Sequence, residues 1–172
     1  QFLAAPPIAG TEHSGPDAAV SELYKGKTIM LCETALTRDA LLDKAEKLFG
    51  QLGMIIRRMD PVEHDKHIAY VSHLSHITSF MLGKTVLEKE TDEQNIFDMA
   101  GSGFASTVRL AKSSPDMWMP IFAQNKQNVL ETLDEYIRNM NAFKEKLAAD
   151  AHEELLAEMK EINKIKTILE HK

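Results

Sequence analysis

Four histidines and an aspartate lie close together between residues 64 and 76 of this chain, in the stretch HDKHIAYVSHLSH. A second polar stretch, GFASTVR, ends at Arg109, and the one tryptophan of the chain, Trp118, follows it. Imidazole and guanidinium groups donate hydrogen bonds and can carry positive charge, and an indole adds a flat apolar face. Such groups within otherwise apolar helical sequence predict the lining of a site for an anionic, ring-shaped substrate.

Helical spacing gives these side chains a common direction. On an α-helix the residues i, i+4, i+7 and i+11 share one face. Asp65, Ser72 and His76 therefore fall on one stripe with His73 beside it, while His64 and its neighbouring histidine point elsewhere.

Metal binding and simple packing are the alternative explanations for the histidines. A metal site needs three or four converging ligands. One helix cannot direct both histidine pairs at one point, and the chain has no HExxH, so we expect no metal. Either His73 or His76 alone would fit a hydrogen-bonded core position. Two of them on adjacent faces, with an arginine expected to meet them, favour a functional site.

Three segments then resemble one known family. The segment EHDKHIAYVSHLSH resembles the entry to the helical domain of prephenate dehydrogenases. GFASTVRLAKSSPDMW resembles that family's arginine-to-tryptophan stretch, with Arg109 and Trp118 at the matching positions. PPIAGTEHSGP resembles the signature HPIAGTExSG of the family's nucleotide-binding domain. The motifs keep the family's order, and the resemblance extends from Phe2 to about Leu147.

The resemblance implies an activity and a set of site residues. The activity is the oxidative decarboxylation of prephenate to 4-hydroxyphenylpyruvate in tyrosine biosynthesis, with NAD or NADP as the oxidant. Arg109 would bind a carboxylate, since a guanidinium matches a carboxylate bidentately. His73 and His76 would act as catalytic groups that donate to the substrate beside Ser72. Trp118 would form a wall of the site, although a purely structural tryptophan fits the pattern equally well.

Two further candidates lie in the signature near the start of the chain. Thr11 and Glu12 match it and would face the helical domain across a cleft, where Glu12 could hold Arg109 when no substrate is bound. The family also implies a homodimer built through the helical domain. Wide apolar stripes in a small domain independently suggest a covering second copy.

The chain departs from the family's pattern at two places. Pro6 stands where the signature has its catalytic histidine, and Ala105-Ser106 replaces the usual Lys-Asp pair before the arginine. No GxGxxG follows a predicted strand, so we expect a part of a longer protein that begins inside its first domain. Two alternatives therefore stay open: an arogenate dehydrogenase, or a helical dimerisation module without activity.

Composition excludes several classes of partner. The 172 residues carry a net charge of -6 without basic clusters, which argues against binding of nucleic acid. No apolar run approaches the length of a membrane span, so we expect no membrane partner. The single cysteine, Cys32, excludes an internal disulfide framework and fits a cytoplasmic location.

The elements that must position the site change in character after residue 60. Strands are expected at FLAA, KTIMLCE and MIIRRM, with a helix capped by Thr37 before the last of them. After Pro61 the apolar period is helical, with one long helix opened by Pro115 and a last one through Leu169. The predicted fold is mainly α. It combines the truncated end of an α/β Rossmann-type domain (residues 1–60) with an all-α dimerisation and substrate-binding domain (residues 61–172).

Overall fold

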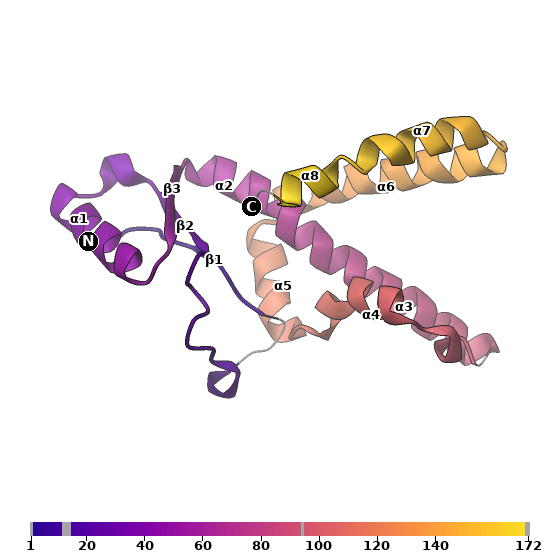
Figure 1. Cartoon of the computed structure of the whole chain (residues 1–172), viewed down its shortest axis with the longest axis horizontal. Helices are drawn as coiled ribbons and strands as arrows, with labels where there is room; N and C mark the ends of the chain where they lie inside the picture. The colour runs from indigo at the N-terminus through magenta and orange to yellow at the C-terminus, as the bar shows by residue number, and fades with distance from the viewer. Residues whose placement is uncertain (1, 12–14, 94, 171–172) are drawn as a thin grey trace. The chain divides into compact units, whose positions relative to one another are not determined.

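The computed structural model describes residues 2–11, 15–93 and 95–170 (Figure 1). The chain divides into two compact units, residues 1–129 and 130–172, and the division falls inside helix α6 (Lys126–Ala148). All residues discussed for the site below belong to the first unit. The predicted domain boundary at residues 60 and 61 stays a prediction.

The described strands form one sheet in the order β1–β2–β3. β1 runs antiparallel to β2, and β2 runs parallel to β3, with helix α1 connecting the parallel pair. The sheet elements are β1 (Pro7–Ile8), β2 (Thr28–Cys32), α1 (Asp39–Gln51) and β3 (Ile55–Met59). Two parallel strands joined through a helix are the repeating unit of α/β folds.

The buried centre of this part is formed by the alternate side chains of β2 and the residue before β3. Ile29 and Leu31 are almost fully buried and pack with Met54. Their burial anchors β2 and so fixes where the loop after β1 can run. The partly buried residues against this cluster are Leu3, Ala5, Phe49 and Ile56.

Two local predictions in this part are wrong. The expected strand at FLAA is reduced to a single bridge between Ala4 and Cys32, and β1 lies later, at Pro7–Ile8. Proline has no N–H to donate, so the two consecutive prolines interrupt the ladder. Thr37 does not cap α1, because its hydroxyl donates to the Glu33 carbonyl and Arg38 occupies the N-cap.

A long helical rod follows residue 60. Asp60 caps it, with its carboxylate accepting from the backbone N–H groups of Val62 and Glu63 at 2.8 and 3.3 Å. Pro61 takes the first helical position, where its missing N–H costs nothing. The rod consists of α2 (Pro61–Ile68), a π-helical turn (Ala69–His73) and α3 (Leu74–Glu93).

The remaining helices of the first unit are short. Residues 97–112 form three short pieces: 3₁₀ turns at Phe97–Met99 and Arg109–Lys112, with α4 (Ser102–Thr107) between them. The single long helix expected from Pro115 is wrong. The chain forms α5 (Pro115–Gln124) and α6 (Lys126–Ala148), separated at Asn125. Asn125 leaves helical geometry, with φ -103° and ψ 28°, and its side chain bonds elsewhere.

The second unit contains the rest of α6, then α7 (His152–Ile162) and α8 (Ile165–Glu170). The last helix predicted through Leu169 is therefore interrupted after Ile162. The Lys146 ammonium and the Glu158 carboxylate, 2.6 Å apart, join α6 to α7. No helix among the described residues is long and apolar enough to cross a membrane. The predicted fold class, mainly α with the end of a Rossmann-type α/β domain followed by a helical domain, is confirmed.

Candidate functional site

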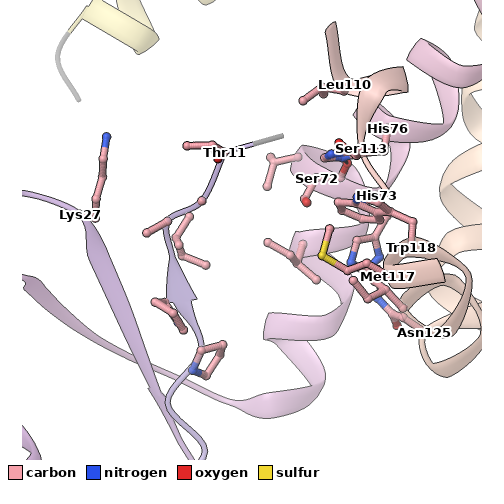
Figure 2. Close-up of a pocket in the computed structure, with 18 of the residues that line it drawn as sticks. Thr11, Lys27, Ser72, His73, His76, Leu110, Ser113, Met117, Trp118 and Asn125 are labelled. Carbon is pink, nitrogen blue, oxygen red and sulfur yellow. Dashed lines mark hydrogen bonds between the residues drawn. The ribbon is translucent and has the colours of Figure 1, made fainter. Parts of the chain in front are cut away.

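A cavity of about 1090 Å³ lies within the first unit, and nearly all the predicted site residues line it (Figure 2). One side comes from residues 6–27 around β1 and the loops that flank it, and we call it the strand wall. The other side comes from α2 to α5, and we call it the helical wall. The polar residues of the helical wall are His64, Asp65, Ser72, His73, His76, Arg109, Ser113, Gln124 and Asn125.

The π-helical turn explains why so many side chains of one helix reach this cavity. Such a turn holds one residue more than an α-turn and therefore rotates the following side chains back by about 100°. His64, which α-helical spacing directs away from His76, lines the same cavity as His76. The prediction that His64 points elsewhere is wrong for this reason.

Trp118 is the aromatic centre of the helical wall. It lies one turn into α5, which Pro115 begins, and is 93% buried. The His76 ring stacks on the indole with 3.6 Å between centroids, and the Phe122 ring lies at 5.3 Å. His73 approaches the indole edge-on at 6.0 Å. The indole therefore packs two imidazoles and forms part of the lining at once.

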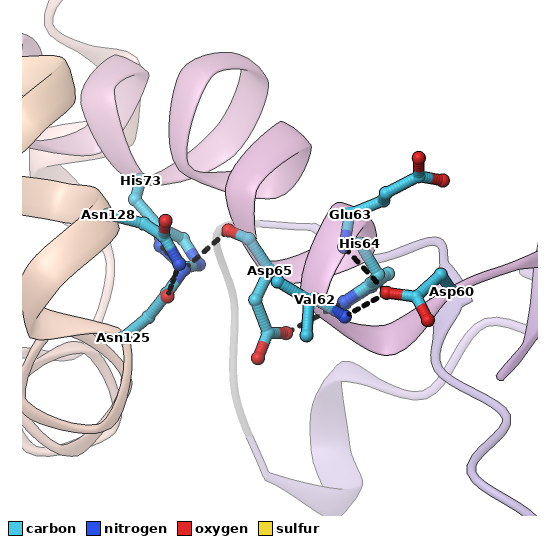
Figure 3. Close-up of polar contacts among 8 residues, drawn as sticks. All are labelled: Asp60, Val62, Glu63, His64, Asp65, His73, Asn125 and Asn128. Atoms are coloured by element: carbon cyan, nitrogen blue, oxygen red, sulfur yellow. Dashed lines mark hydrogen bonds and ion pairs between the residues drawn. The ribbon is translucent and has the colours of Figure 1, made fainter. Parts of the chain in front are cut away.

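Asn125 connects the two helices that carry these rings (Figure 3). Its amide nitrogen donates to the backbone carbonyl of Asp65 at 2.7 Å and lies 3.3 Å from Nδ1 of His73. Its amide oxygen accepts from Asn128 at 2.7 Å. The break between α5 and α6 thus frees an amide that holds the π-helical turn in place.

Of the histidines that line the cavity, His73 and His76 have lowered pKa values. Burial lowers the pKa of His73 most, and the neighbouring His76 lowers it further, against a raising effect of Asp65. Burial also lowers the pKa of His76, where the bond to the Ser72 carbonyl opposes the shift. Near neutral pH both rings are therefore uncharged hydrogen-bonding groups.

Arg109 begins a 3₁₀ turn, and hydrogen bonds from α3 hold the backbone of this turn. The Ser79 hydroxyl donates to the Thr107 carbonyl at 3.0 Å and accepts from the Ala111 backbone N–H at 3.1 Å. Ser79 is buried, so this pair of bonds clamps the backbone on both sides of Arg109. The guanidinium group is exposed and lines the cavity, and its charge lowers the pKa of His76.

Three buried polar atoms of the helical wall have no hydrogen-bond partner among the described residues: Nε2 of His64, Oγ of Ser113 and Nε1 of Trp118. Buried donors and acceptors are nearly always paired, so each such atom calls for an explanation. All three residues line the cavity. The cavity is therefore lined by residues whose buried polar atoms lack a partner among the described residues.

All but one of the predicted site residues line this cavity, and the remaining one lies outside the described residues. His73, His76, Ser72, Arg109 and Trp118 line the helical wall, and exposed Thr11 lines the strand wall. Glu12 lies outside the described residues. These roles stay predictions. Among residues 2–11, 15–93 and 95–170, no group of three or more His, Cys, Asp or Glu side chains could hold a metal ion.

Ser113 and Asn125 were not predicted from the sequence, and His64 was expected to point away from the site. Ser113 carried no signal of its own. Asn125 did carry one, because it falls four residues after Ile121 on the apolar stripe of a predicted helix. A polar amide at such a position indicates either a break in the helix or a buried hydrogen bond.

Pro6 lies on the strand wall and is partly buried. Its carbonyl accepts a hydrogen bond from the backbone N–H of Met30 at 3.1 Å. A residue other than proline at position 6 would also have a backbone N–H, which could donate a second ladder hydrogen bond to Met30. Its side chain offers neither donor nor acceptor. Position 6 therefore supplies apolar surface where an imidazole would supply acid–base chemistry.

Comparison with known proteins places the chain among dehydrogenases. A family model described as the prephenate dehydrogenase dimerization domain matches residues 60–161, and one described as the prephenate dehydrogenase nucleotide-binding domain matches residues 1–57. The chain is 29% identical over 164 residues to the cyclohexadienyl dehydrogenase of Zymomonas mobilis, covering 95% of this chain and 56% of that protein. It is also 29% identical over 144 residues to the Bacillus subtilis prephenate dehydrogenase, covering 84% of this chain and 39% of that protein.

Two solved structures share the fold. Prephenate dehydrogenase from Aquifex aeolicus, in complex with hydroxyphenyl propionate and NAD+, superposes with a TM-score of 0.87 at 36% identity, covering 97% of this chain and 58% of that one. The arogenate dehydrogenase of Synechocystis superposes with a TM-score of 0.80 at 25% identity, covering 96% and 60%. The chain spans between 39% and 60% of the length of these four proteins.

Proposed function

The chain belongs to the prephenate dehydrogenase family, and from that premise we propose that the complete protein oxidatively decarboxylates prephenate to 4-hydroxyphenylpyruvate. In this reaction the ring carbon that bears the hydroxyl gives up a hydride to the nicotinamide of NAD or NADP, and the ring carboxylate leaves as carbon dioxide. The chain described here supplies the substrate side of that site. It would serve tyrosine biosynthesis in the cytoplasm.

The observation that carries the proposal is the convergence of anion-binding and ring-binding groups in one cavity. Arg109 can hold a carboxylate bidentately, and Ser113 and Trp118 offer buried donors that lack partners among the described residues. The indole and the His76 ring stacked on it present flat apolar surface to a ring. A dianion that carries one carboxylate on a six-membered ring and the other on the side chain of that ring fits this combination of groups.

The residues of the chain act on binding, orientation and protons. Carboxylate binding by Arg109 would orient the ring, and buried donors of the helical wall would stabilise negative charge where water is excluded. His73 and His76, uncharged near neutral pH, would donate to or accept from the substrate's oxygen atoms. Thr11 would complete the cavity from the strand wall.

The residues present do not form a site for the dinucleotide itself. The pyrophosphate of a dinucleotide is held by a glycine-rich turn between a strand and a helix N-terminus. No GxGxxG follows a strand in the 172 residues. We therefore expect the 172-residue chain alone to show no binding of NAD by calorimetric titration. A micromolar dissociation constant would contradict this and require a different binding mode.

Arogenate is the second candidate substrate. It carries an amino group where prephenate carries a keto group. The match to an arogenate dehydrogenase and to an enzyme named for the wider cyclohexadienyl class favours testing it beside prephenate. The described cavity residues hold the ring and its carboxylate in either case.

We also propose that the helical part forms a homodimer. Large apolar side chains of α6 to α8 are exposed, and a matched second copy would bury them. The family model over residues 60–161 is described as a dimerization domain. Sedimentation equilibrium at micromolar concentration should give twice the chain mass, and a purely monomeric species would contradict the proposal. The exposed apolar residues include Ile137, Met140, Phe143, Leu156, Met159 and Ile162.

The activity is tested by following reduction of NAD and of NADP with the complete protein, given prephenate or arogenate. We expect substrate-dependent reduction of one of the two nucleotides with release of carbon dioxide. Turnover should be slow because position 6 is proline. No reduction with either substrate, in a protein that sediments as a folded dimer, would favour the inactive dimerisation module.

A further inference from the structure

We propose that Asn125 is a positioning residue that fixes His73 in its Nε2–H tautomer. His73 then presents a hydrogen-bond donor to the cavity, while His76, held as the opposite tautomer, presents an acceptor. The consequence for substrate rests on the proposed function. The tautomers themselves are a property of the chain and can be measured without substrate.

The orientation of the Asn125 amide follows from its partners (Figure 3). The Asp65 backbone carbonyl can only accept a hydrogen bond, so the amide atom 2.7 Å from it must be the nitrogen. The oxygen is occupied at the other end, where it accepts from Asn128 at 2.7 Å. The hydrogen-bond partners therefore identify which atom of the amide is nitrogen and which is oxygen.

The His73 tautomer follows from that orientation. The same Asn125 nitrogen lies 3.3 Å from Nδ1 of His73, and its second hydrogen is directed to that atom. A donor needs an acceptor, so Nδ1 of His73 must carry the lone pair and Nε2 the proton. A proton on Nδ1 would set two N–H groups against each other.

His76 reaches the opposite tautomer through the backbone. Its Nδ1 lies 2.9 Å from the Ser72 carbonyl oxygen, which can only accept, so Nδ1 carries the proton. In the neutral ring this leaves Nε2 as an acceptor. One helix thus offers the cavity two imidazoles of opposite hydrogen-bonding sense, three residues apart.

The surroundings of the two rings favour their neutral form. Only a neutral imidazole has one donor and one acceptor nitrogen, so only this form has distinct tautomers. Burial is the largest influence on each ring and lowers both pKa values. From α5, the uncharged rings of Trp118 and Phe122 lie against His73. The charged or titratable groups that act on the pair are His64, Asp65 and Arg109. Of these, only Asp65 favours protonation, and it acts on His73.

In the proposed reaction, the donor on His73 and the acceptor on His76 would contact different groups of the substrate. A substrate carboxylate or carbonyl oxygen accepts from a donor such as Nε2–H of His73. A substrate hydroxyl donates to an acceptor such as Nε2 of His76. Asn125, which contacts His73 and not His76, would act only through the first of these.

Nitrogen-15 NMR of the full chain at about pH 7.5 tests the tautomers directly. Signals are assigned by comparison with His73→Gln and His76→Gln. We expect Nδ1 of His73 to be unprotonated with a protonated Nε2, and His76 to show the reverse. A protonated Nδ1 on His73 would overturn the proposal. Because no substrate is present, that result would leave the proposed activity untouched, and lack of activity would leave the tautomers standing.

Variants at position 125 test whether the asparagine sets the tautomer. In Asn125→Asp an acceptor replaces the donor, so His73 should take a proton on Nδ1 and its pKa should rise, with the His76 pattern unchanged. Asn141→Asp, an equal charge change at an exposed position of α6, should leave both rings unchanged. In Asn125→Ala the His73 signals should move to the average of two exchanging tautomers. If both folded variants kept the wild-type pattern on His73, the assigned role would be wrong.

Discussion

The strand wall and the helical wall of the cavity differ in how their polar groups are used. On the strand wall, the backbone of residues 4–8 is paired with β2, and the side chain at position 6 is a proline. On the helical wall, the backbone is satisfied within helices, and histidines, an arginine, two serines and a tryptophan line the cavity. The helical wall therefore has the groups for recognition, whereas the strand wall has a proline at the position where the sequence resemblance implies a catalytic histidine.

From this difference we infer that substrate binding and catalytic turnover depend on different walls of the cavity. A wall rich in donors and rings can hold an anionic substrate without a general base opposite it. Changes on the strand wall should then act on kcat, and changes on the helical wall should act on KM. The predictions below, made for the complete protein, are arranged from the largest expected effect to the smallest.

Replacing Pro6 by histidine should give the largest change. A positioned general acid or base typically contributes about 10²–10⁴ in rate. We expect Pro6→His to raise kcat for prephenate at least about tenfold with little change in KM. The substitution also returns an N–H that can pair with Met30 across β1 and β2, so thermal stability should not fall. An already fast parent, or no gain in kcat, would show that another residue handles the proton.

Removing the guanidinium from the helical wall should have the next largest effect. A hydrogen bond to a charged group contributes about 1.5–3 kcal/mol, so Arg109→Ala should raise KM for prephenate about tenfold to a hundredfold. Nucleotide affinity should stay nearly unchanged, and His76→Ala should act in the same direction more weakly. Arg138→Ala, at an exposed position of α6, is the matched control and should leave both constants unchanged. Unaltered prephenate kinetics in Arg109→Ala would refute the assignment of the anion site.

Variants of two buried serines, Ser113 and Ser79, distinguish an effect on substrate binding from an effect on stability. The Ser113 hydroxyl has no partner among the described residues, whereas the Ser79 hydroxyl makes two hydrogen bonds. Ser113→Ala should raise KM roughly twofold to tenfold while leaving the free energy of unfolding unchanged, because an uncharged hydrogen bond contributes about 0.5–1.5 kcal/mol.

Ser79→Ala is the counterpart of that variant. It removes two part-buried hydrogen bonds, one to the Thr107 carbonyl and one from the Ala111 N–H, and should lower the free energy of unfolding by about 1–3 kcal/mol. Urea denaturation of both proteins makes the comparison. A Ser113→Ala protein as destabilised as Ser79→Ala would mean that the Ser113 hydroxyl supports the fold rather than a ligand.

The pH dependence of stability should be the smallest effect. The pKa values of His73 and His76 are lowered on folding from the ordinary 6.5, so the unfolded chain binds protons more strongly than the folded chain. Their contribution is complete above 6.5 and is lost as the pH falls below it toward the lowered values. Urea denaturation at about pH 7.5 and about pH 5.5 measures this loss.

Histidine variants identify the source of that loss. The double variant His73→Gln, His76→Gln should lose less stability on acidification than the parent. His152→Gln removes an exposed histidine, with 73% of its side chain accessible, and should keep the parent's dependence. An equal loss in the double variant and the parent would show that other groups cause the acid sensitivity.

The parts of the fold that the sequence predicted are those set by local patterns. The apolar runs of β2 and β3, and Asp60-Pro61 as the start of a helix, agree with the structure because each depends on neighbouring residues alone. The strand at FLAA failed because two consecutive prolines interrupt its pairing with β2, and the Thr37 cap failed because the Thr37 hydroxyl bonds to the Glu33 carbonyl. An apolar run or a capping residue type does not specify these bonds.

The candidate site shows the same limit. Which residue types would gather was predictable, since His73, His76, Arg109 and Trp118 belong to recognisable motifs. The inclusion of His64 was not, because it requires a π-helical turn, and periodicity assumes a uniform helix. The role of Asn125 was not either, because its partner Asp65 lies sixty residues away in the chain.

The indole N–H of Trp118 gives the most direct test of substrate recognition by the helical wall. The chain has a single tryptophan, so its indole gives one resonance in a nitrogen-15 correlation spectrum. That N–H is buried, belongs to a residue that lines the cavity and has no partner among the described residues. Titration with hydroxyphenyl propionate, the ligand named for the Aquifex aeolicus structure, should shift this resonance saturably, and less steeply in Arg109→Ala. An indole resonance that stays fixed while other signals shift, or a spectrum that does not respond at all, would contradict the account.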